Sequence, residues 1–472
     1  MFSSDVIALV ILCFINLINY MDRFTVAGIL DEIQNYYNLD DKQGGLLQTS
    51  FVVAYMIFAP LFGYLGDRYS RKYLMCVGVL FWSLTTFLGS IIPKHYPGLF
   101  FLMRGLVGVG EASYSTIAPT LIADLFSKDK RSKCLAIFYF AIPVGSGLGY
   151  IIGTKMSAVM SNWKWALRVT PVLGVIAVVL TLLFLREPKR GQSDGVMEEH
   201  VKSDIFNDIK YISTVKSYIW STIGFTCVCF AIGALSWWAP KFMTSAIAVH
   251  EKLELSENND SLRQRVSLIF GIISCIAGIA GVVLGVSASQ WYRKYNPRAD
   301  PLVCGVGVLV SVPFAFVGIL LASSVPVLTW IFVFIAVTLL CTNWSLVADI
   351  LLYVIVPHRR SFAQSIQILI SHLFGDASSP FIVGAISDAF KNDSTTFTNY
   401  ISLRNALFVN CFVLIIGGMA FLYTAYFIVI DQENCKKEIE GNRDAIDQGS
   451  HRDSTLSDNN ESLQSFPPPS SN

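Results

Sequence analysis

The feature that most restricts the fold of this chain is a series of apolar stretches, each about as long as a membrane is thick. A helix needs about 20 mostly apolar residues to cross the hydrocarbon core of a bilayer. Twelve stretches of the 472-residue chain meet this requirement, at residues 5–31, 43–64, 73–92, 97–126, 133–156, 164–185, 218–246, 266–291, 302–322, 327–355, 361–388 and 402–430. Because 53% of the residues are hydrophobic and only 15% are charged, a soluble domain could not bury the apolar surface. We therefore predict an all-α membrane protein with twelve transmembrane helices.

The distribution of basic residues between the spans predicts the orientation in the membrane. They are concentrated in the loops that follow even-numbered spans, which hold Arg68, Arg71, Lys72, Lys128, Lys130, Arg131, Lys133, Arg293, Lys294, Arg359 and Arg360. Because loops rich in Lys and Arg stay in the cytosol, we expect both termini to be cytosolic. The sequons at Asn259 and Asn392 then fall in outward loops, where we predict glycosylation. The N-terminus lacks a basic n-region and a cleavage site, so we interpret the first stretch as a retained helix.

Spans one to six and seven to twelve look like two copies of one unit. Span four ends in "LIADLFSKDKRSK" and span ten in "LVADILLYVIVPHRRS", so each closes on Ala-Asp before a basic turn. We divide the chain into an N-terminal half (1–185), a cytosolic linker (186–217), a C-terminal half (218–430) and a disordered cytosolic tail (431–472). Two six-helix halves joined by a cytosolic linker are typical of alternating-access transporters.

An acid and a base lie side by side within the first apolar stretch, in the segment "NYMDRFTVAGIL". A helix that ended at Tyr20 would have a span of only about 15 residues, which is too short to cross the membrane. The helix must therefore continue past Asp22 and Arg23. Charges at that depth are costly unless they face protein or a water-filled cavity. At 100° per residue, one polar face of this helix contains Asn16, Asn19, Asp22 and Arg23.

The fourth span carries a second polar stripe, formed by Arg104, Gly108, Glu111 and Ser115. The helical rise places Arg104 about 10 Å outward of Glu111, with the charged pair of the first helix at a depth between them. We hypothesise a four-member network in which Arg104 and Arg23 alternate between Asp22 and Glu111. When an anionic head group draws an arginine away, a buried carboxylate takes up a proton, and this exchange would couple a proton to transport. The alternative is a static, charge-neutral lock between the two helices.

The eleventh span offers a second titratable pair near mid-depth. His372 and Asp376 lie one turn apart, and an imidazole titrates in the range of an acidic compartment. The alternative for His372 is a structural hydrogen bond to a neighbouring carbonyl. Gly375 and Pro380 predict a locally irregular helix that lines the cavity. Asn343 of the tenth span lies at a similar depth and is a candidate neutral contact.

The loop between spans two and three, "GYLGDRYSRK", is a candidate cytosolic gate. Asp67 can accept hydrogen bonds from the start of a neighbouring helix. Arg68 and Arg71 can pair with acids such as Asp124, which would latch the cytosolic side and favour the outward-facing state. The alternative is that the basic residues only keep the loop in the cytosol.

Two further motifs concern packing between helices. Gly145, Gly149 and Gly153 recur every fourth residue and form a small-residue face for close helix packing. The segment "SWWAPKF" (236–242) places a proline and two tryptophans at the outer end of span seven, which fits an outer gate, although an interfacial tryptophan belt explains the aromatics almost as well. Lys241 of this segment could attract a phosphate-bearing head group or extend its charge outward to the interface.

Several of these segments resemble a known family. "GYLGDRYSRK" resembles the loop 2–3 signature of the major facilitator superfamily and departs from it at Ser70, where glycine is usual, while "RGLVGVGEA" is similar to that superfamily's span-four motif. "NYMDRFTVAGIL", "NWSLVADILLYVIVPHRRS" and "SHLFGDASSPFIVGAISD" resemble segments of the Spinster family. The resemblance implies the major facilitator fold and a proton-linked carrier of lysophospholipids or of sphingoid lipids such as a sphingosine phosphate. It also implies a late endosomal or lysosomal membrane, with the plasma membrane as the alternative.

Other function classes are less consistent with the sequence. A net charge of +1 gives no reason to expect a nucleic-acid partner. The chain has no nucleotide-binding loop and no soluble catalytic domain, so we expect neither an ATP-driven pump nor an enzyme. We expect no metal and no cofactor beyond a proton gradient, and a monomer whose partners are the lipid substrate and the membrane. Two alternatives stay open, a facilitator carrier for a small polar solute or organic anion, and a membrane receptor that does not transport.

Overall fold

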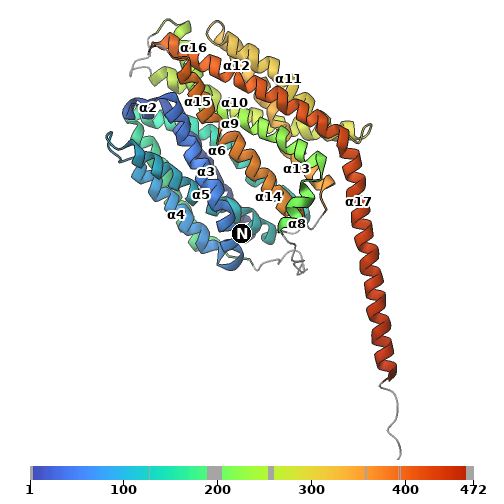
Figure 1. Cartoon of the computed structure of the whole chain (residues 1–472). Helices are drawn as coiled ribbons and strands as arrows, with labels where there is room; N and C mark the ends of the chain where they lie inside the picture. Colours follow the sequence, from blue (N-terminus) through green and yellow to red (C-terminus); the bar gives the residue numbers. More distant parts are fainter. Residues whose placement is uncertain are drawn as a thin grey trace, which may run out of the picture.

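The computed structural model describes residues 4–126, 128–188, 205–253, 260–356, 359–391, 393 and 395–463. The helices of the N-terminal half are α1 (Ser4–Gly28), α2 (Leu30–Tyr37), α3 (Asp41–Arg68), α4 (Arg71–Gly89), α5 (Pro97–Leu125), α6 (Lys128–Val159), the short η1 (Trp163–Trp165) and α7 (Ala166–Phe184). The linker contains α8 (Ile205–Ile212). The C-terminal half consists of α9 (Lys216–His250), α10 (Asp260–Arg293), α11 (Ala299–Leu321), α12 (Pro326–Cys341), α13 (Asn343–Val354), α14 (Arg360–Ser371), the π-helical turn η3 (His372–Asp376), α15 (Ser379–Ala389), α16 (Thr396–Leu407) and α17 (Val409–Leu463). Figure 1 shows α4 and α5 on one side of the molecule and α11 and α12 on the other.

Eleven helical segments in the described part of the chain are long and apolar enough to cross a membrane. The helix α5 is not among them, because it carries Arg104, Glu111 and several hydroxyl-bearing residues that lower its hydropathy. It is nevertheless one continuous helix of 29 residues, long enough to span about 44 Å, and it packs against α3 and α4. The prediction of twelve membrane helices in two halves is therefore confirmed, and the helix with the weakest apolar signal is the one that carries charge.

The eleventh span is irregular, as the sequence predicts. Its two helical parts, α14 and α15, flank the π-helical turn, in which the amide of Ala377 donates to the carbonyl of His372 at 2.9 Å. Pro380 follows at the start of α15. A π-helical turn widens the helix by one residue and is frequent at functional sites. This turn therefore interrupts the span at the depth of the candidate pair His372 and Asp376.

The linker and the tail contain more helix than expected. The linker helix α8 is fixed to the C-terminal half by an ion pair between Asp208 and Arg359, at 2.9 Å. The tail was expected to be disordered from residue 431, whereas α17 continues to Leu463 and projects beyond the bundle (Figure 1). No proline interrupts the chain between the last span and Pro467, so the backbone hydrogen bonds of the helix can continue past the membrane.

The first helix is positioned by the glycine face of α6. A Cβ atom on Gly145 would lie 2.6 Å from the carbonyl oxygen of Leu17, and one on Gly149 would lie 2.6 Å from that of Met21. Gly153 approaches the next turn of α1, at Thr25. The four-residue spacing therefore matches α1 turn by turn, which confirms the predicted close packing. This contact fixes the rotation of α1 about its axis and hence the direction of its polar face.

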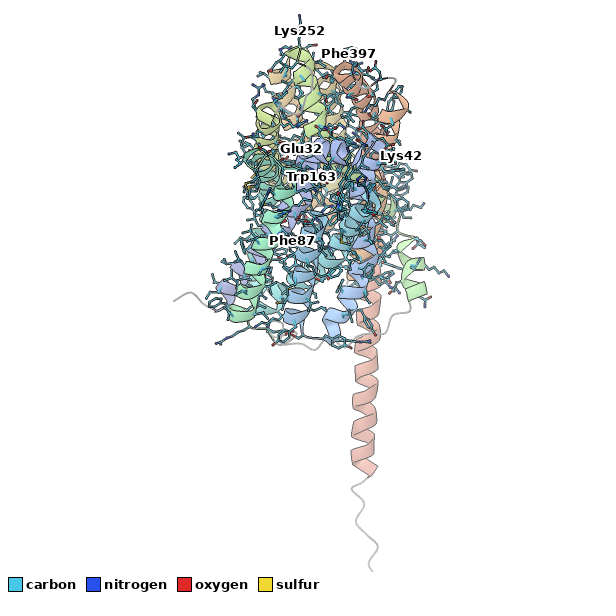
Figure 2. The ribbon with its side chains drawn as sticks, turned by 90° about the vertical axis from the view of Figure 1, so that its left-hand side faces the viewer. Glu32, Lys42, Phe87, Trp163, Lys252 and Phe397 are labelled. Carbon is cyan, nitrogen blue, oxygen red and sulfur yellow. The ribbon has the colours of Figure 1, made fainter. Side chains whose placement is uncertain are left out.

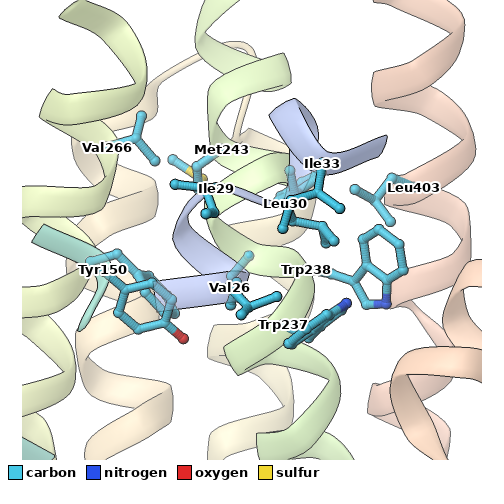
Figure 3. Packing of buried hydrophobic residues seen from close by; sticks show 14 of the residues in the cluster. Val26, Ile29, Leu30, Ile33, Tyr150, Trp237, Trp238, Met243, Val266 and Leu403 are labelled. Carbon is cyan, nitrogen blue, oxygen red and sulfur yellow. The ribbon is translucent and has the colours of Figure 1, made fainter. Parts of the chain in front are cut away.

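The two halves are packed together at one end of the bundle. We call this the outer end, because it carries the loops after odd-numbered spans; Figure 2 shows Lys252 and Phe397 there, opposite the projecting end of α17. Buried side chains of both halves, among them Ile33, Tyr150 and Trp237, form one continuous apolar cluster. Figure 3 shows these three side chains among those gathered in the space between the helices. The outer end is therefore closed by apolar packing between the halves.

Candidate functional site

The polar face of α1 is buried, as its helical phase predicts. Asn16, Asn19 and Asp22 are almost completely inaccessible to solvent. The side-chain amide of Asn16 donates to the carbonyl of Phe138 at 2.8 Å, which ties this face to α6. These polar side chains of α1 thus face the protein interior, which reduces the free-energy cost of placing them at membrane depth.

Asp22 is held by three different helices. Arg104 Nη1 of α5 lies 3.4 Å from Oδ2, and Thr86 of α4 donates to the same oxygen at 3.5 Å. Thr170 of α7 donates to Oδ1. Both carboxylate oxygens therefore have partners, and the side chains of Asp22 and Arg104 are 1% and 4% exposed. Asp22 is thus held in place at the junction of four helices.

The second ion pair of the network is less enclosed. Arg23 Nε lies 2.7 Å from Glu111 Oε2, and the Glu111 side chain is fully buried whereas that of Arg23 is 16% exposed. In the described part of the chain, the other carboxylate oxygen, Glu111 Oε1, accepts no hydrogen bond. Arg104 connects the two pairs, because its Nη2 lies 3.4 Å from the carbonyl oxygen of Arg23. The four predicted residues therefore form one network, with Arg23 on Glu111 and Arg104 on Asp22.

Aromatic rings surround the Arg23 guanidinium group. Its central carbon lies 4.9 Å from the ring centroids of Tyr20, Phe51 and Tyr55 alike. The two arginines share one of these rings, because the central carbon of the Arg104 guanidinium lies 4.6 Å from the ring centroid of Phe51. Aromatic faces attract cations, so these rings stabilise both guanidinium groups without adding a charge. The network consequently contains two acids and two bases, and its formal charge is zero.

The structure also pairs His372 with Asp376 in the C-terminal half. His372 Nδ1 lies 2.9 Å from both carboxylate oxygens of Asp376. The side chains are 24% and 28% exposed, which is more than any member of the N-terminal network. His372 lies close enough to Arg23 of the other half for the charges of the two side chains to interact. The alternative in which His372 bonds a carbonyl is therefore not what the structure shows, since its partner is a carboxylate.

Asn343 is not brought to this network. It begins α13, directly after the interruption at Thr342, and its side chain is fully buried. Its amide nitrogen donates to the carbonyl of Leu340 at 3.1 Å. The short asparagine side chain turns back to that carbonyl, at the interruption between α12 and α13. In this conformation the Asn343 amide ties the start of α13 to the end of α12, and its neutral contact with a cavity stays a prediction.

The loop between spans two and three forms the expected ion pair and one that was not foreseen. Arg71 Nη1 lies 2.5 Å from Asp124 Oδ2, as predicted. The unforeseen partner is Glu187, which accepts from the Ser70 hydroxyl at 2.5 Å and from the Arg71 amide at 2.8 Å. Both partners belong to the N-terminal half or its junction with the linker. The loop is therefore tied to the start of the linker through Ser70, the position that departs from the usual glycine.

Two further residues were predicted to belong to the cytosolic gate, Arg68 and Asp67. Arg68 lies over the ring of Tyr64, with 3.8 Å between the guanidinium carbon and the ring centroid. The backbone of Asp67 belongs to the last turn of α3, but its side chain lies outside the described residues. The predicted glycosylation sites Asn259 and Asn392 also lie outside the described residues.

Sequence reasoning did not find the hydroxyl groups that hold Asp22, nor Glu187. Thr86 and Thr170 lie within apolar spans, and nothing in their spacing distinguishes them from Thr85 and Thr181 of the same helices. The contact of Glu187 could have been predicted from the sequence, because this acid comes directly after span six and lies on the same side of the membrane as a basic loop. Only the folded chain brings these residues to their partners.

Comparison with known proteins agrees with this architecture. Residues 12–380 match the family model of the Major Facilitator Superfamily. The chain is 51% identical to protein spinster homolog 1 of Bos taurus over 439 residues, covering 91% of this chain and 82% of that protein. It is 46% identical to the sphingosine-1-phosphate transporter SPNS2 of Xenopus tropicalis, covering 89% and 82%. It is also 45% identical to protein spinster of Drosophila melanogaster, covering 94% and 80%.

Solved structures show the same fold. A bacterial homologue of the human lysosomal transporter Spinster, in an inward-facing and unoccupied conformation, superposes with a TM-score of 0.77 at 18% identity, covering 91% of this chain and 99% of that one. The nucleoside transporter NupG superposes with a TM-score of 0.66 at 13% identity, covering 90% and 99%. Fold and family together define a multi-pass membrane transporter. The chain belongs to the Spinster family of the major facilitator superfamily.

The contact between Glu187 and the loop predicts a pH-dependent contribution to stability. Burial raises the pKa of Glu187, but the hydrogen bonds from Ser70 and Arg71 outweigh it and hold the pKa below its ordinary value. A carboxylate with a lowered pKa stabilises the fold above its unfolded pKa, about 4.3, and this contribution is lost as the pH falls through the lowered value. We expect Glu187→Ala to reduce stability by about 1 kcal/mol at pH 7, as for loss of a helix cap. Thermal unfolding in detergent at pH 7 and below pH 4 measures the difference.

A matched variant, Ser70→Gly, restores the usual residue of the loop signature and removes the hydroxyl donor together with its Cβ atom. It should lose less stability than Glu187→Ala and should keep part of the pH dependence, because the Arg71 amide still donates to the carboxylate. Equal stability of Glu187→Ala and the parent at both pH values would contradict the assignment.

Proposed function

We propose that this chain is a proton-linked secondary transporter of phosphate-bearing amphiphilic lipids, which it moves by alternating access. The substrate class is a lysophospholipid or a sphingoid lipid such as a sphingosine phosphate. Two findings support the proposal: a relative 46% identical bears the name of a sphingosine-1-phosphate transporter, and the interior contains a charge network suited to an anionic head group.

The pair of Arg23 and Glu111 carries the proposal. Arg23 is the accessible member of the network, at 16% exposure, while the carboxylate it neutralises is fully buried. A lipid phosphate that entered the interior would compete with Glu111 for the guanidinium group, because arginine binds carboxylate and phosphate in the same way. Separation of the pair would leave a buried carboxylate without its cation, a state that protonation relieves.

This exchange gives a coupled cycle. Lipid binding moves Arg23 from Glu111 to the phosphate, and Glu111 accepts one proton. Lipid release returns Arg23 to Glu111, and the proton is expelled. Asp22 and Arg104 remain paired throughout, because both Asp22 oxygens have partners, and they hold α1 against α5 during the exchange. His372 and Asp376 face the same region from the other half and are the second candidate proton site.

The same proposal includes the location and the orientation. We place the protein in a late endosomal or lysosomal membrane with both termini in the cytosol. The basic loops after even-numbered spans support the orientation, and an acidic compartment would supply the gradient that the cycle requires. The plasma membrane is the alternative.

Lipid flux into reconstituted vesicles tests the function. The expected result is uptake of a fluorescent lysolipid phosphate that a pH gradient accelerates and a protonophore abolishes. The same lipid backbone without its phosphate should be carried poorly, because it cannot displace Arg23 from Glu111. Flux that ignores the gradient would contradict proton coupling, and flux of small sugars or organic anions without lipid flux would contradict the substrate class.

A further inference from the structure

One cation of the C-terminal half is inserted among acceptors of the N-terminal half at the outer end. Lys241 Nζ of α9 lies 2.7 Å from Asp41 Oδ1, 2.6 Å from Gln34 Oε1 and 3.5 Å from Asp31 Oδ1. The Lys241 side chain is only 16% exposed. Neither interpretation drawn from the sequence, a lysine extending outward or one awaiting a head group, describes this ion pair.

A second connection crosses the halves beside the first. Asp388 of α15 accepts hydrogen bonds from the amides of Asp41 and Lys42, at 3.1 and 2.7 Å. These are amides of the first turn of α3, which lack partners within their own helix. Ser387 donates to the second carboxylate oxygen of Asp41 at 2.9 Å. The start of α3 is thus capped by a residue from the other half of the molecule, in addition to its own cap at Asp40.

The surroundings of these ion pairs are tightly packed. Trp237 and Trp238 are buried, and Trp237 donates to the carbonyl of Gly44 in the N-terminal half at 3.1 Å. A Cβ atom on Gly45 would lie 2.2 Å from the carbonyl oxygen of Pro380. The backbones of α3 and α15 therefore touch, and burial of both tryptophans contradicts the alternative of an interfacial belt. Charges that are partly withdrawn from water in this way interact more strongly than fully solvated charges.

We propose that Asp31, Gln34, Asp41, Lys241 and Asp388, here called the outer cluster, hold the outer entrance closed and separate once in every transport cycle. The proposal rests on alternating access as the proposed function. It assigns Lys241 a role in setting which conformation is populated, apart from the central network that binds proton and lipid. The cluster joins the halves, so its ion pairs exist in the outward-closed state and are lost when the halves part.

Removal of the cation should therefore favour opening. Without Lys241 the buried carboxylate of Asp41 and the partly exposed one of Asp31 lose their nearest cation, although the charge of Lys391 still acts on Asp41. An uncompensated buried charge is strongly unfavourable, whereas opening exposes both acids to water. The outward-open state loses no such contact, so its population rises relative to the closed state.

The test measures access to the interface from the outer side of the membrane. A single cysteine at Val26, in the full-length chain with its native cysteines replaced, lies in the buried apolar cluster between the halves (Figure 3). We expect Lys241→Met to accelerate labelling of this cysteine by an impermeant maleimide about tenfold, equivalent to about 1.4 kcal/mol between the two states. Lys241→Arg, which keeps the charge, should label nearly as slowly as the parent.

A double variant that exchanges the two charges, Lys241→Asp with Asp41→Lys, distinguishes the loss of a specific ion pair from a general loosening of the fold. We expect it to slow labelling again relative to Lys241→Met. Should Lys241→Met fail to fold, Asp388→Asn provides the milder opening variant, with a smaller acceleration. Unchanged labelling in Lys241→Met or in Asp388→Asn, or failure of the exchange to restore slow labelling, would overturn the proposal. Labelling requires no lipid, so a failure of lipid transport alone would overturn only the proposed function.

Discussion

Glu111→Gln is expected to abolish the acceleration of lipid flux by a pH gradient while the protein remains folded in the membrane. The amide keeps the shape of the side chain and can still accept a hydrogen bond from Arg23, but it cannot bind and release a proton. Glu111 Oε1 makes no hydrogen bond in the described part of the chain, so the new NH₂ group displaces no existing donor. Arg23 keeps its stacking against Tyr20, Phe51 and Tyr55, which limits the cost of losing its counter-charge.

The measurement compares flux in reconstituted vesicles with and without the gradient. The parent should show an increase that the variant lacks. Tyr55→Phe is a matched control, because it removes the hydrogen bond from Tyr55 to Ser115, at 2.7 Å, next to the network and leaves all four charges in place. The control should retain its response to the gradient. A Glu111→Gln protein that still responds would show that the proton binds elsewhere, with His372 and Asp376 as the next candidates.

Arg104→Gln is expected to cause the largest loss of folded protein. Arg104 and Asp22 are 4% and 1% exposed and lie 3.4 Å apart. Removal of the guanidinium group leaves a buried carboxylate whose remaining donors are the hydroxyl groups of Thr86 and Thr170. Breaking a buried ion pair by deleting one partner typically costs about 3–5 kcal/mol. We expect a strong fall in the yield of monodisperse protein and in its unfolding temperature.

The double variant Asp22→Asn with Arg104→Gln distinguishes a charge effect from a packing effect. It removes both charges together and should recover a large part of the stability lost by Arg104→Gln. Thr170→Val, which deletes one donor to Asp22, should cost about 1 kcal/mol. A double variant no more stable than Arg104→Gln would mean that the pair acts through packing rather than through its charges.

The membrane fold and the depth of its charges follow from one-dimensional properties of the chain. The length of each apolar stretch is compared with a bilayer of known thickness, and this comparison alone places Asp22 and Arg23 inside the membrane. Helical phase then groups them with Asn16 and Asn19 on one face, which the structure buries. The glycine spacing on α6 was predictive for the same reason, since a four-residue repeat defines a face without knowledge of its partner.

The pairing of the charges could not be read in this way. Asp22 and Arg23 are adjacent, so on a helix their side chains diverge by about 100°, and each must find its partner on another helix. The sequence was compatible with either arginine on either acid. The crossing of α1 and α5 decides that Arg104 reaches Asp22 and Arg23 reaches Glu111, because only distances between helices determine which ends meet.

The sequence by itself determined the number of membrane helices, the two halves, the buried polar face of α1 and the four members of the central network. Only the tertiary structure showed that Thr86 and Thr170 hold Asp22, that Glu187 binds the loop between spans two and three, that Asn343 turns back to the end of α12, and that Lys241 joins the halves. Apolar length and periodicity act along one chain segment and are visible in its letters. The partner of a polar side chain depends on how separate helices cross, and residues as far apart as Asp41 and Asp388 meet only when the two halves close.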